Sequence, residues 1–234
     1  WNERILTTEV NGIGVVRILE AIRKHSPDTR FYQASSSEMF GDATESPQSE
    51  TTPFRPRNPY GASKVLAHHL TTNYRDNYGI FACAGICFNH ESPRRGQEFV
   101  TRKLTFGVAQ IKLGLARNLP VGNLEAKRDW GFAPDYVRAM WLMLQQPDPD
   151  DFVIATGQAR TVKELVDTAF SSVGLKWQDH VVVDEKLFRP AEKVPLVGNP
   201  SKAKKMLDWE SQVSFESMID LMVKADMDRL GSEH

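Results

Sequence analysis

The sequence lacks the long hydrophobic runs of a membrane protein and has no excess of charge of either sign. No apolar stretch approaches the ~18 residues that a membrane-spanning helix needs, and no basic leader precedes an apolar segment. The 234 residues include 29 Lys and Arg against 30 Asp and Glu, a formal net charge of -1. Because bulk positive charge is the usual mark of a nucleic-acid partner, we expect a cytoplasmic protein that binds neither nucleic acid nor a membrane.

Cysteine is also scarce. Cys83 and Cys87 are the only two cysteines, and both lie in the apolar run 80–88. Four residues along a strand span roughly 13 Å, which is too far for a disulfide. Two cysteines without clustered histidines also make a poor zinc site. We therefore expect buried free thiols and no metal.

The third absence is a glycine fingerprint. Dinucleotide-binding folds hold the pyrophosphate with G-x-G-x-x-G between a strand and a helix. Residues 11–14 read Asn-Gly-Ile-Gly, but they follow no predicted strand and lack the third glycine. We interpret this pair as a turn that starts a helix.

Helical and strand patterns alternate along the chain, with apolar residues at helical spacing in 11–24 and a uniformly apolar run in 80–88. This order predicts an α/β fold with a parallel, doubly wound sheet. The predicted helices are 11–24, 60–77, 103–115, 133–146, 161–173, 202–207 and 215–230, and the predicted strands are 30–35, 80–88, 119–123, 152–156 and 181–183.

Two of these segments carry more specific predictions. Thr161 and Glu164 have the spacing of a capping box, which places a helix start at Thr161. Residues 42–59 contain four prolines among polar residues, so they form a long loop. A loop of this length usually covers a site, and its acidic residues are most simply solvated.

The run 58–64 places a phenol and an ammonium one helical turn apart. Pro59 favours a first helical turn, so Tyr60 and Lys64, at i and i+4, project from the same face. The ordinary pKa of tyrosine is about 10, so Tyr60 needs a fixed positive charge to act as a base, and Lys64 can supply it. A packed tyrosine beside a solvated lysine is the simpler alternative.

Upstream of this run, residues 31–41 form an apolar strand that ends in small polar residues. Ser36 and Glu38 are two apart, so in extended backbone they point to one side. In open α/β sheets ligands bind beyond such strand ends. We expect Ser36, Glu38, Tyr60 and Lys64 to share one crevice, although Glu38 as a cap and Ser36 as a turn hydroxyl also fit.

A basic loop follows the strand 80–88. Residues 89–104 hold three arginines, one lysine and one histidine. Arginine binds phosphate through two parallel hydrogen bonds, so this loop suits an anionic ligand. A solvated loop fits the composition equally well.

Together these motifs resemble the extended short-chain dehydrogenase/reductase superfamily. The serine-rich strand end followed by Tyr-x-x-x-Lys is similar to the superfamily, and Ser-x-Glu is similar to its nucleotide-sugar dehydratases. Residues 89–96, 99–103, 128–131 and 189–192 resemble the GDP-mannose 4,6-dehydratase family most, and the likeness runs from about Val10 to the C-terminal helix.

The resemblance implies a Rossmann-like sheet whose N-terminal third, with the glycine loop, lies outside this sequence, and a smaller C-terminal substrate-binding domain. Residues 1–92 and about 129–157 would form the cofactor domain, and 93–128 with 158–234 the sugar-nucleotide domain. It further implies NADP as cofactor, GDP-mannose as substrate and a homodimer or homotetramer.

The resemblance also assigns roles to individual residues. The catalytic set would be Ser36, Glu38, Tyr60 and Lys64. Cofactor contacts would come from Tyr60, Lys64, His90 and Arg95. Substrate contacts would come from Asn89, Lys103, Gly122, Arg128, Arg189 and Glu192.

The implied reaction is an internal oxidation, elimination and reduction that yields a 4-keto-6-deoxy sugar. Two alternatives stay open. An epimerase or reductase of the same superfamily shares Tyr60 and Lys64 but needs no carboxylate two residues after Ser36, so Glu38 favours the dehydratase. A catalytically silent fragment or sensor module is the other alternative.

Overall fold

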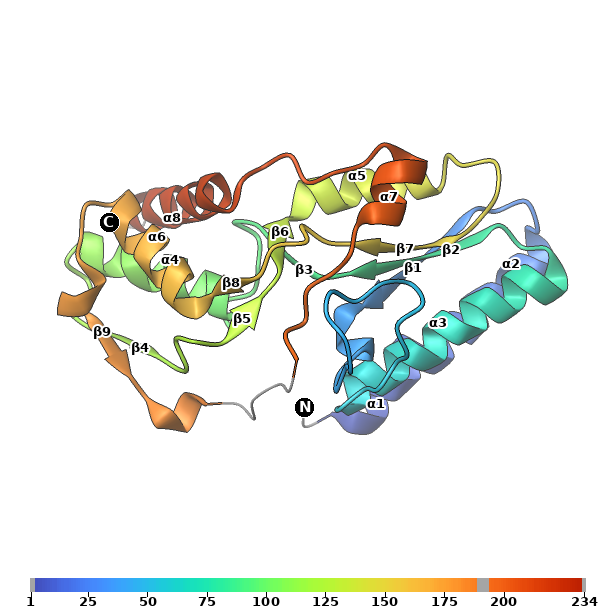
Figure 1. Ribbon diagram of the computed structural model, residues 1–234, viewed down its shortest axis with the longest axis horizontal. Helices are drawn as coiled ribbons and strands as arrows, with labels where there is room; N and C mark the ends of the chain where they lie inside the picture. Colours follow the sequence, from blue (N-terminus) through green and yellow to red (C-terminus); the bar gives the residue numbers. More distant parts are fainter. Residues whose placement is uncertain (1–2, 189–193, 233–234) are drawn as a thin grey trace.

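The computed structural model describes residues 3–188 and 194–232, which fold into two halves with a cleft between them. In Figure 1 the half on the right contains the main sheet, and the half on the left contains α4, α6 and α8. The chain passes between the halves more than once, so each half is built from separate stretches of sequence.

The main sheet has three parallel strands in the order β1-β2-β7. They are β1 (Phe31–Ser36), β2 (Ala82–Cys87) and β7 (Asp151–Ile154). Every residue of β2 is buried, because this strand is central and both of its faces are covered. The predicted parallel sheet is confirmed.

Helices cover both faces of this sheet (Figure 1). On one face, α2 (Gly14–His25) and α3 (Pro59–Tyr78) share a core with β2. On the other face, α5 (Ala133–Met143) and α7 (Ser201–Leu207) pack around Phe152. This is the doubly wound arrangement that the alternating pattern predicts.

The N-terminal segment differs from its prediction. Helix α1 (Arg4–Thr8) continues through the π-helical turn η1 (Glu9–Ile13) into α2, so Gly12 lies inside a helix and the predicted turn at 11–14 is wrong. A Cβ atom on Gly12 would lie 2.9 Å from Leu66 Cδ2 of α3. The absence of a side chain at Gly12 thus leaves room for Leu66 between the two helices.

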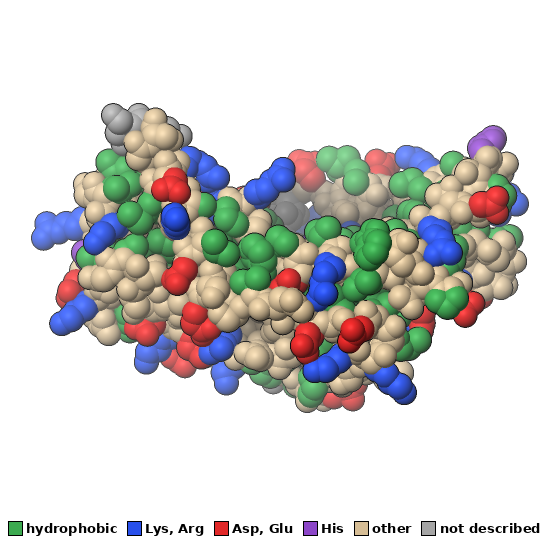
Figure 2. All heavy atoms as spheres, turned by 90° about the horizontal axis from the view of Figure 1, so that it is seen from above, with side chains coloured by type: hydrophobic (Ala, Val, Ile, Leu, Met, Phe, Trp, Pro, Cys, Tyr) green, Lys and Arg blue, Asp and Glu red, His purple; other side chains and the backbone are tan. Residues whose placement is uncertain are grey.

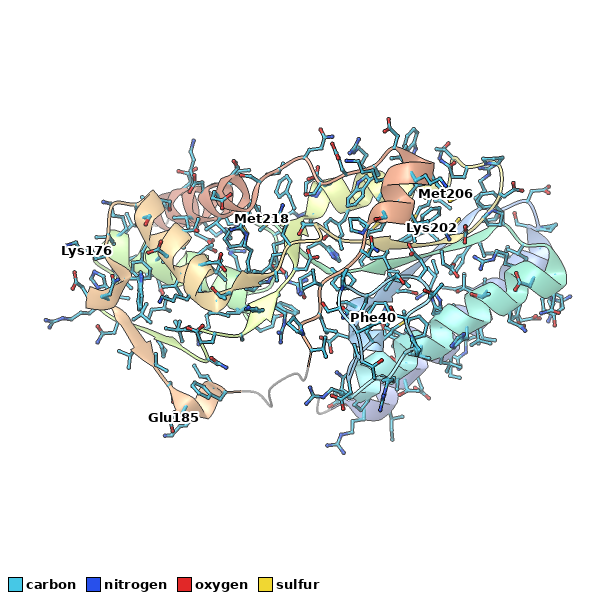
Figure 3. The ribbon with its side chains drawn as sticks, in the orientation of Figure 1. Phe40, Lys176, Glu185, Lys202, Met206 and Met218 are labelled. Atoms are coloured by element: carbon cyan, nitrogen blue, oxygen red, sulfur yellow. The ribbon has the colours of Figure 1, made fainter. Side chains whose placement is uncertain are left out.

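The second half is built on three helices, α4 (Val100–Lys112), α6 (Val162–Ser172) and α8 (Phe215–Ser232). Met218 of α8 is fully buried in their shared core (Figure 3). The capping box predicted at the start of α6 is confirmed, since the Thr161 hydroxyl accepts from the Glu164 amide and the Glu164 carboxylate accepts from the Thr161 amide.

Short strands complete this half and join it to the sheet. Strand β4 (Leu119–Val121) runs parallel to β9 (Val181–Val183), and β5 (Lys127–Arg128) runs antiparallel to β8 (Arg160–Thr161). The 3-10 turns η3 (Trp177–Asp179) and η4 (Glu185–Leu187) flank β9. At the junction, β3 (Asn89–Glu91) pairs in parallel with β6 (Trp130–Phe132).

Asp129 fixes the junction between the halves. Its fully buried carboxylate accepts from the backbone amides of Thr156, Gly157 and Gly198 at 3.0, 3.0 and 3.2 Å. The Thr156 hydroxyl donates to it as well, at 2.6 Å. Four hydrogen bonds thus tie two chain segments, at residues 156–157 and at Gly198, to one side chain.

Helix α7 packs on the sheet, whereas the predicted domain division places residues 201–207 in the second unit.

The helix predicted at 133–146 is only partly buried. Its outer face is open to solvent, since Val137 and Trp141 are each 59% exposed. Figure 2, seen from the side of α5, α7 and α8, shows hydrophobic side chains among interspersed charges of both signs.

The predicted proline-rich loop 42–59 folds back onto the sheet, and of its residues only Pro59, which already belongs to α3, lines the cleft described below. The Glu50 carboxylate accepts from the backbone amide of Val153 at 2.8 Å, and Gln48 bridges to Gly198. The expectations that this loop covers the site and that Glu50 is merely solvated are therefore wrong. Within 3–188 and 194–232 no helix is both long and apolar enough to cross a membrane.

Candidate active site

The cleft between the two halves has a volume of about 1270 Å³. This exceeds the roughly 300–1,000 Å³ of a typical pocket for one small ligand, so two ligands can lie side by side. Its walls include every predicted site residue that the structure describes: Ser36, Glu38, Tyr60, Lys64, Asn89, His90, Arg95, Lys103, Gly122 and Arg128. The predicted substrate residues Arg189 and Glu192 lie outside the described residues.

Strand β1 delivers Ser36 and Glu38 to the cleft by a route that differs from the prediction. The strand ends at Ser36, and residues 37–39 form the 3-10 turn η2 (Ser37–Met39). The Ser36 hydroxyl caps this turn by accepting from the Glu38 amide at 3.2 Å. Glu38 therefore reaches the cleft from a tight turn, and the expected extended backbone is wrong.

Helix α3 delivers Tyr60 and Lys64. Asn58 caps the helix, since its Oδ1 accepts from the Gly61 amide at 2.7 Å, and Pro59 occupies the first turn. A Cβ atom on Gly61 would lie only 2.6 Å from the carbonyl oxygen of Glu38. The start of α3 thus lies directly against η2, which brings the phenol and the carboxylate into one site.

The Tyr60 phenol lies on the cleft wall, where surrounding protein atoms raise its pKa above the usual value. A hydrogen bond with Ser36 lowers the pKa, the negative charge of Glu38 raises it, and the positive charge of Arg95 lowers it. The balance keeps Tyr60 protonated at neutral pH. Arg95 is thus a second cation, beside Lys64, that can favour the phenolate.

Lys64 is anchored at the base of this site. Its Nζ donates to the carbonyl oxygen of Ala34 at 2.9 Å and lies 5.6 Å from the centre of the Tyr60 ring. Burial lowers the pKa of Lys64, and the nearby Cys87 thiol raises it. The predicted role of Lys64, holding Tyr60 as a phenolate, stays a prediction.

Arg95 is held over the cleft by a ring and a buried carboxylate. Its guanidinium stacks on Phe99, 3.5 Å from the ring centre. Its Nε lies 3.3 Å from the carboxylate of Glu91, which is 2% exposed and accepts from the Thr101 hydroxyl at 2.5 Å. Burial raises the pKa of Glu91 and the charge of Arg95 lowers it. The geometry leaves the buried Arg95 Nε without a hydrogen bond.

Arg102, another cation of the basic loop, is unavailable to a ligand. Its Nε donates to both carboxylate oxygens of Asp226 in α8, at 2.9 and 3.0 Å. Its Nη1 donates to the carbonyl oxygens of Pro93 and Arg95 at 2.7 and 3.0 Å. From the composition of the loop, Arg102 was expected to bind phosphate or to be solvated. In the structure it is buried instead and supports the loop that carries Arg95.

His90 presents one ring nitrogen to the cleft. Its Nδ1 lies 2.8 Å from the carbonyl oxygen of Phe88, which can only accept, so Nδ1 carries a proton and donates it. The ring stacks on Tyr136, with ring centres 5.1 Å apart. This fixes the orientation of His90.

The far wall belongs to the second half. A Cβ atom on Gly122 would lie 3.0 Å from the carbonyl oxygen of Leu187, so this glycine allows η4 to approach β4. Arg128 donates to the carbonyl oxygen of Lys127 at 2.6 Å, and Lys103 comes from the first turn of α4. In the described part of the chain, no group of three or more His, Cys, Asp or Glu side chains could hold a metal.

Sequence reasoning missed three residues that support the site. Asn58 donates to Glu38, Glu91 pairs with Arg95, and Asp226 pairs with Arg102. Asn58 had a local signal, because asparagine before a first-turn proline is a common helix cap. Asp226 had none, since 124 residues separate it from Arg102.

Comparison with known proteins gives a consistent result. Residues 1–222 match the family described as GDP-mannose 4,6 dehydratase. The chain is 56% identical to GDP-mannose 4,6 dehydratase 1 of Arabidopsis thaliana over 226 residues, covering 95% of this chain and 62% of that protein. It is 46% identical to the human GDP-mannose 4,6 dehydratase over 241 residues, covering 95% of this chain and 65% of that protein. The chain thus spans about three fifths of the length of the curated relatives that it matches.

Solved structures share the fold. The structure of RMD from Pseudomonas aeruginosa complexed with NADPH superposes with a TM-score of 0.91. It is 23% identical in sequence, and the match covers 98% of this chain and 77% of that one. At this identity the likeness establishes the Rossmann-type α/β fold.

Proposed function

The chain belongs to the GDP-mannose 4,6-dehydratase family, and from this premise we propose that it converts GDP-D-mannose to GDP-4-keto-6-deoxy-D-mannose and water. The observation that carries the proposal is the placement of Glu38 and Tyr60 on one cleft wall, with the starts of η2 and α3 in direct contact. An epimerase or a reductase needs the phenol but not the carboxylate.

The cleft suits NADP as the bound cofactor. When bound, NADP would accept a hydride from the sugar and later return it, so no net oxidation occurs. Tyr60, Lys64, His90 and Arg95 are the residues proposed to hold it. Arg95 lines the cleft, and a guanidinium at a cleft wall fits a ligand that carries phosphates.

Tyr60 is proposed to remove the proton of the sugar C4 hydroxyl. The neighbouring Ser36 hydroxyl, which lowers the pKa of Tyr60, would hold the C4 oxygen. Because the cleft keeps the phenol protonated, Tyr60 must first release its own proton to solvent before it can accept the sugar proton, and positive charge from Lys64 and Arg95 would favour that ionised form. These two cations have distinct anchors, the Ala34 carbonyl and the Phe99 ring.

Glu38 is proposed to catalyse the elimination. Oxidation at C4 makes the proton on C5 acidic, and the Glu38 carboxylate would remove it as a general base. The protonated carboxyl would then give that proton to the departing C6 hydroxyl, which leaves as water. One carboxylate thus acts as base and then as acid, and atoms balance without a further reactant.

The opposite wall is proposed to hold the nucleotide. Asn89 and Lys103 would contact the sugar nucleotide near the junction, and Gly122 and Arg128 would contact it from the second half. The roles proposed for Arg189 and Glu192, on the phosphates or ribose, concern residues outside those described.

The assembly and compartment are proposals too. We propose a cytoplasmic homodimer or homotetramer, and the oligomer is supported by the apolar side chains that α1, η1 and α2 leave exposed. Ile5, Val10, Ile13 and Ile18 are 79%, 62%, 40% and 50% exposed. Sedimentation analysis of the purified protein tests this.

The deciding experiment is the product mass after the full-length protein is incubated with GDP-mannose and NADP. We expect a product lighter by one water, with no net reduction of the cofactor. Glu38→Gln should abolish the keto sugar, because an amide cannot accept the C5 proton, and Tyr60→Phe should block the first oxidation. If Glu38→Gln forms the keto sugar at the parental rate, the dehydratase proposal fails.

The same assay separates the alternatives. A product of unchanged mass but inverted configuration indicates an epimerase, and consumption of reduced cofactor indicates a reductase. A silent fragment gives no product. Calorimetric titration of the chain with NADPH and with GDP then shows whether it still binds both ligands.

A further inference from the structure

Asn58 uses both ends of its side-chain amide. Its Oδ1 accepts from the Gly61 amide at 2.7 Å, and its Nδ2 donates to Glu38 Oε2 at 2.9 Å. The residue lies in extended backbone, with φ -149 and ψ 159, immediately before α3. It is therefore the one described residue that hydrogen bonds both to the frame of α3 and to the Glu38 carboxylate.

The orientation of this amide is fixed by its partners. The Gly61 backbone N–H can only donate, so the oxygen of the Asn58 side chain must face it. The NH₂ group then faces the Glu38 carboxylate, which when ionised can only accept. In the flipped orientation the Asn58 NH₂ group would face the Gly61 N–H, donor against donor, and Oδ1 would face the Glu38 carboxylate, acceptor against acceptor. The hydrogen-bond partners therefore permit only one orientation of the amide.

Capping alone does not require asparagine. Serine and aspartate cap helices about as well, but neither supplies an NH₂ donor at that distance from the cap. The helix cap therefore does not use the NH₂ group of Asn58, which donates to Glu38 instead. Among the described residues, Oε2 is the Glu38 oxygen so bound, and Oε1 receives no side-chain hydrogen bond.

We propose that Asn58 is a positioning residue for Glu38, holding Oε2 against the start of α3 so that Oε1 is presented to the C5 proton of the sugar. This inference rests on the proposed dehydratase function. Asn58 acts through Glu38 and touches no reacting atom. Its substitution should slow proton removal from C5 and leave the preceding oxidation by Tyr60 unchanged.

Two variants separate positioning from capping. Asn58→Ser keeps a cap and loses the donor. Asn58→Asp keeps a cap and places a second carboxylate against Glu38, where like charge favours the protonated form of Glu38. Asn77→Ser is the matched control, because Asn77 lies on the same helix and its side chain bonds only the exposed Asn73 carbonyl.

The expected results are specific to the elimination step. For Asn58→Ser, kcat should fall about 10-fold with KM and the unfolding temperature unchanged. For Asn58→Asp, the acid limb of the kcat profile should also move to higher pH, because the carboxylate pair retains a proton longer. Deuterium incorporation at C5 should slow in both, while the transient absorbance of reduced cofactor appears at the parental rate.

The contact is also tested without turnover. In the chain labelled with ¹⁵N, the Asn58 side-chain signal is identified by its loss in Asn58→Asp, and it should shift in Glu38→Ala but not in Glu45→Ala. Parental kcat and pH profile in both Asn58 variants, or an amide signal insensitive to Glu38→Ala, would overturn the inference. An absence of keto sugar from the unaltered protein would instead refute the proposed function, and the amide signal would still decide the contact.

Discussion

Lys64 lies over the Tyr60 ring, with Nζ 5.6 Å from the ring centre, and donates its hydrogen bond to the carbonyl oxygen of Ala34. The ammonium is thus fixed by the strand β1 and not by the phenol. Burial lowers the pKa of Lys64 and raises the pKa of Tyr60. Both shifts favour the neutral form, so the resting site holds a phenol.

The first prediction concerns the ionisation of Tyr60 in the chain without cofactor. Because its pKa is raised, Tyr60 should ionise above the usual pH of about 10, and its contribution to stability should be lost as pH rises through that range. The ultraviolet difference between the chain and Tyr60→Phe, followed against pH, measures it.

Arg95 provides the check on this prediction. Its positive charge lowers the pKa of Tyr60, so Arg95→Gln should move the ionisation to still higher pH. Arg94→Gln, which removes a charge from the neighbouring position of the same loop, should leave it in place. An Arg95→Gln titration identical to the parent would show that the guanidinium does not act on the phenol.

The second prediction concerns Asp226. This fully buried carboxylate binds Arg102 and accepts from the Thr105 hydroxyl at 2.8 Å. Asp226→Asn leaves a buried guanidinium without its counter-charge, so we expect a loss of about 3–5 kcal/mol of unfolding free energy. Urea unfolding measures it, and Asp220→Asn on the exposed face of α8 should stay within about 0.5 kcal/mol of the parent.

The third prediction concerns the contact between η2 and α3. In Gly61→Ala the new Cβ would lie 2.6 Å from the Glu38 carbonyl oxygen, so the helix start must move away. A shift of about 1 Å can cost about 100-fold in rate, and we expect kcat to fall on that order. Gly14→Ala, whose Cβ would meet Glu9 O at 3.4 Å, should keep parental kcat.

The fourth prediction concerns Cys87, which is 6% exposed. Burial raises the pKa of its thiol from 9.0 to about 11, against a smaller opposing effect of the hydrogen bond with Tyr32 and the charge of Lys64. Because the pKa is higher in the folded state, the protonated thiol of Cys87 contributes its full stabilisation below pH 9. This contribution is lost as pH rises from about 9 to 11. Two pKa units correspond to about 2.7 kcal/mol.

Thiol alkylation and unfolding test this prediction together. At pH 8 the folded chain should resist iodoacetamide, and both cysteines should react once the chain is unfolded in urea. Between pH 8 and 11 the parent should lose more stability than Cys87→Ala. Equal losses in the two proteins would show that Cys87 does not contribute.

Local patterns predicted the parts of the fold that local physics determines. The uniformly apolar run 80–88 gave the buried central strand, and the Thr161 and Glu164 spacing gave the start of α6. Glu38 lines the cleft as predicted, but from a 3-10 turn and not from extended backbone. A serine such as Ser36 can either continue a strand or end it by capping a turn, and the local sequence does not distinguish the two. Gly12 lies close to Leu66 of α3, and this contact between residues far apart in the sequence is not encoded by any local pattern.

Charge patterns were less informative than apolar ones. Arg95 and Arg102 look alike in the sequence of the basic loop, yet one lines the cleft and the other is buried against α8. The difference arises from Asp226, 124 residues away from Arg102. Whether a loop arginine binds a ligand or supports the fold therefore cannot be predicted until its partner from a distant part of the sequence is known.

The four hydrogen bonds to Asp129 have a mechanical consequence. They fasten the residues after β7 and Gly198 to the segment between β5 and β6, so the two halves meet at one hydrogen-bonded seam. Hinge bending across that seam would strand a buried carboxylate without donors. We therefore expect the separation of the two cleft walls to change little when a ligand binds.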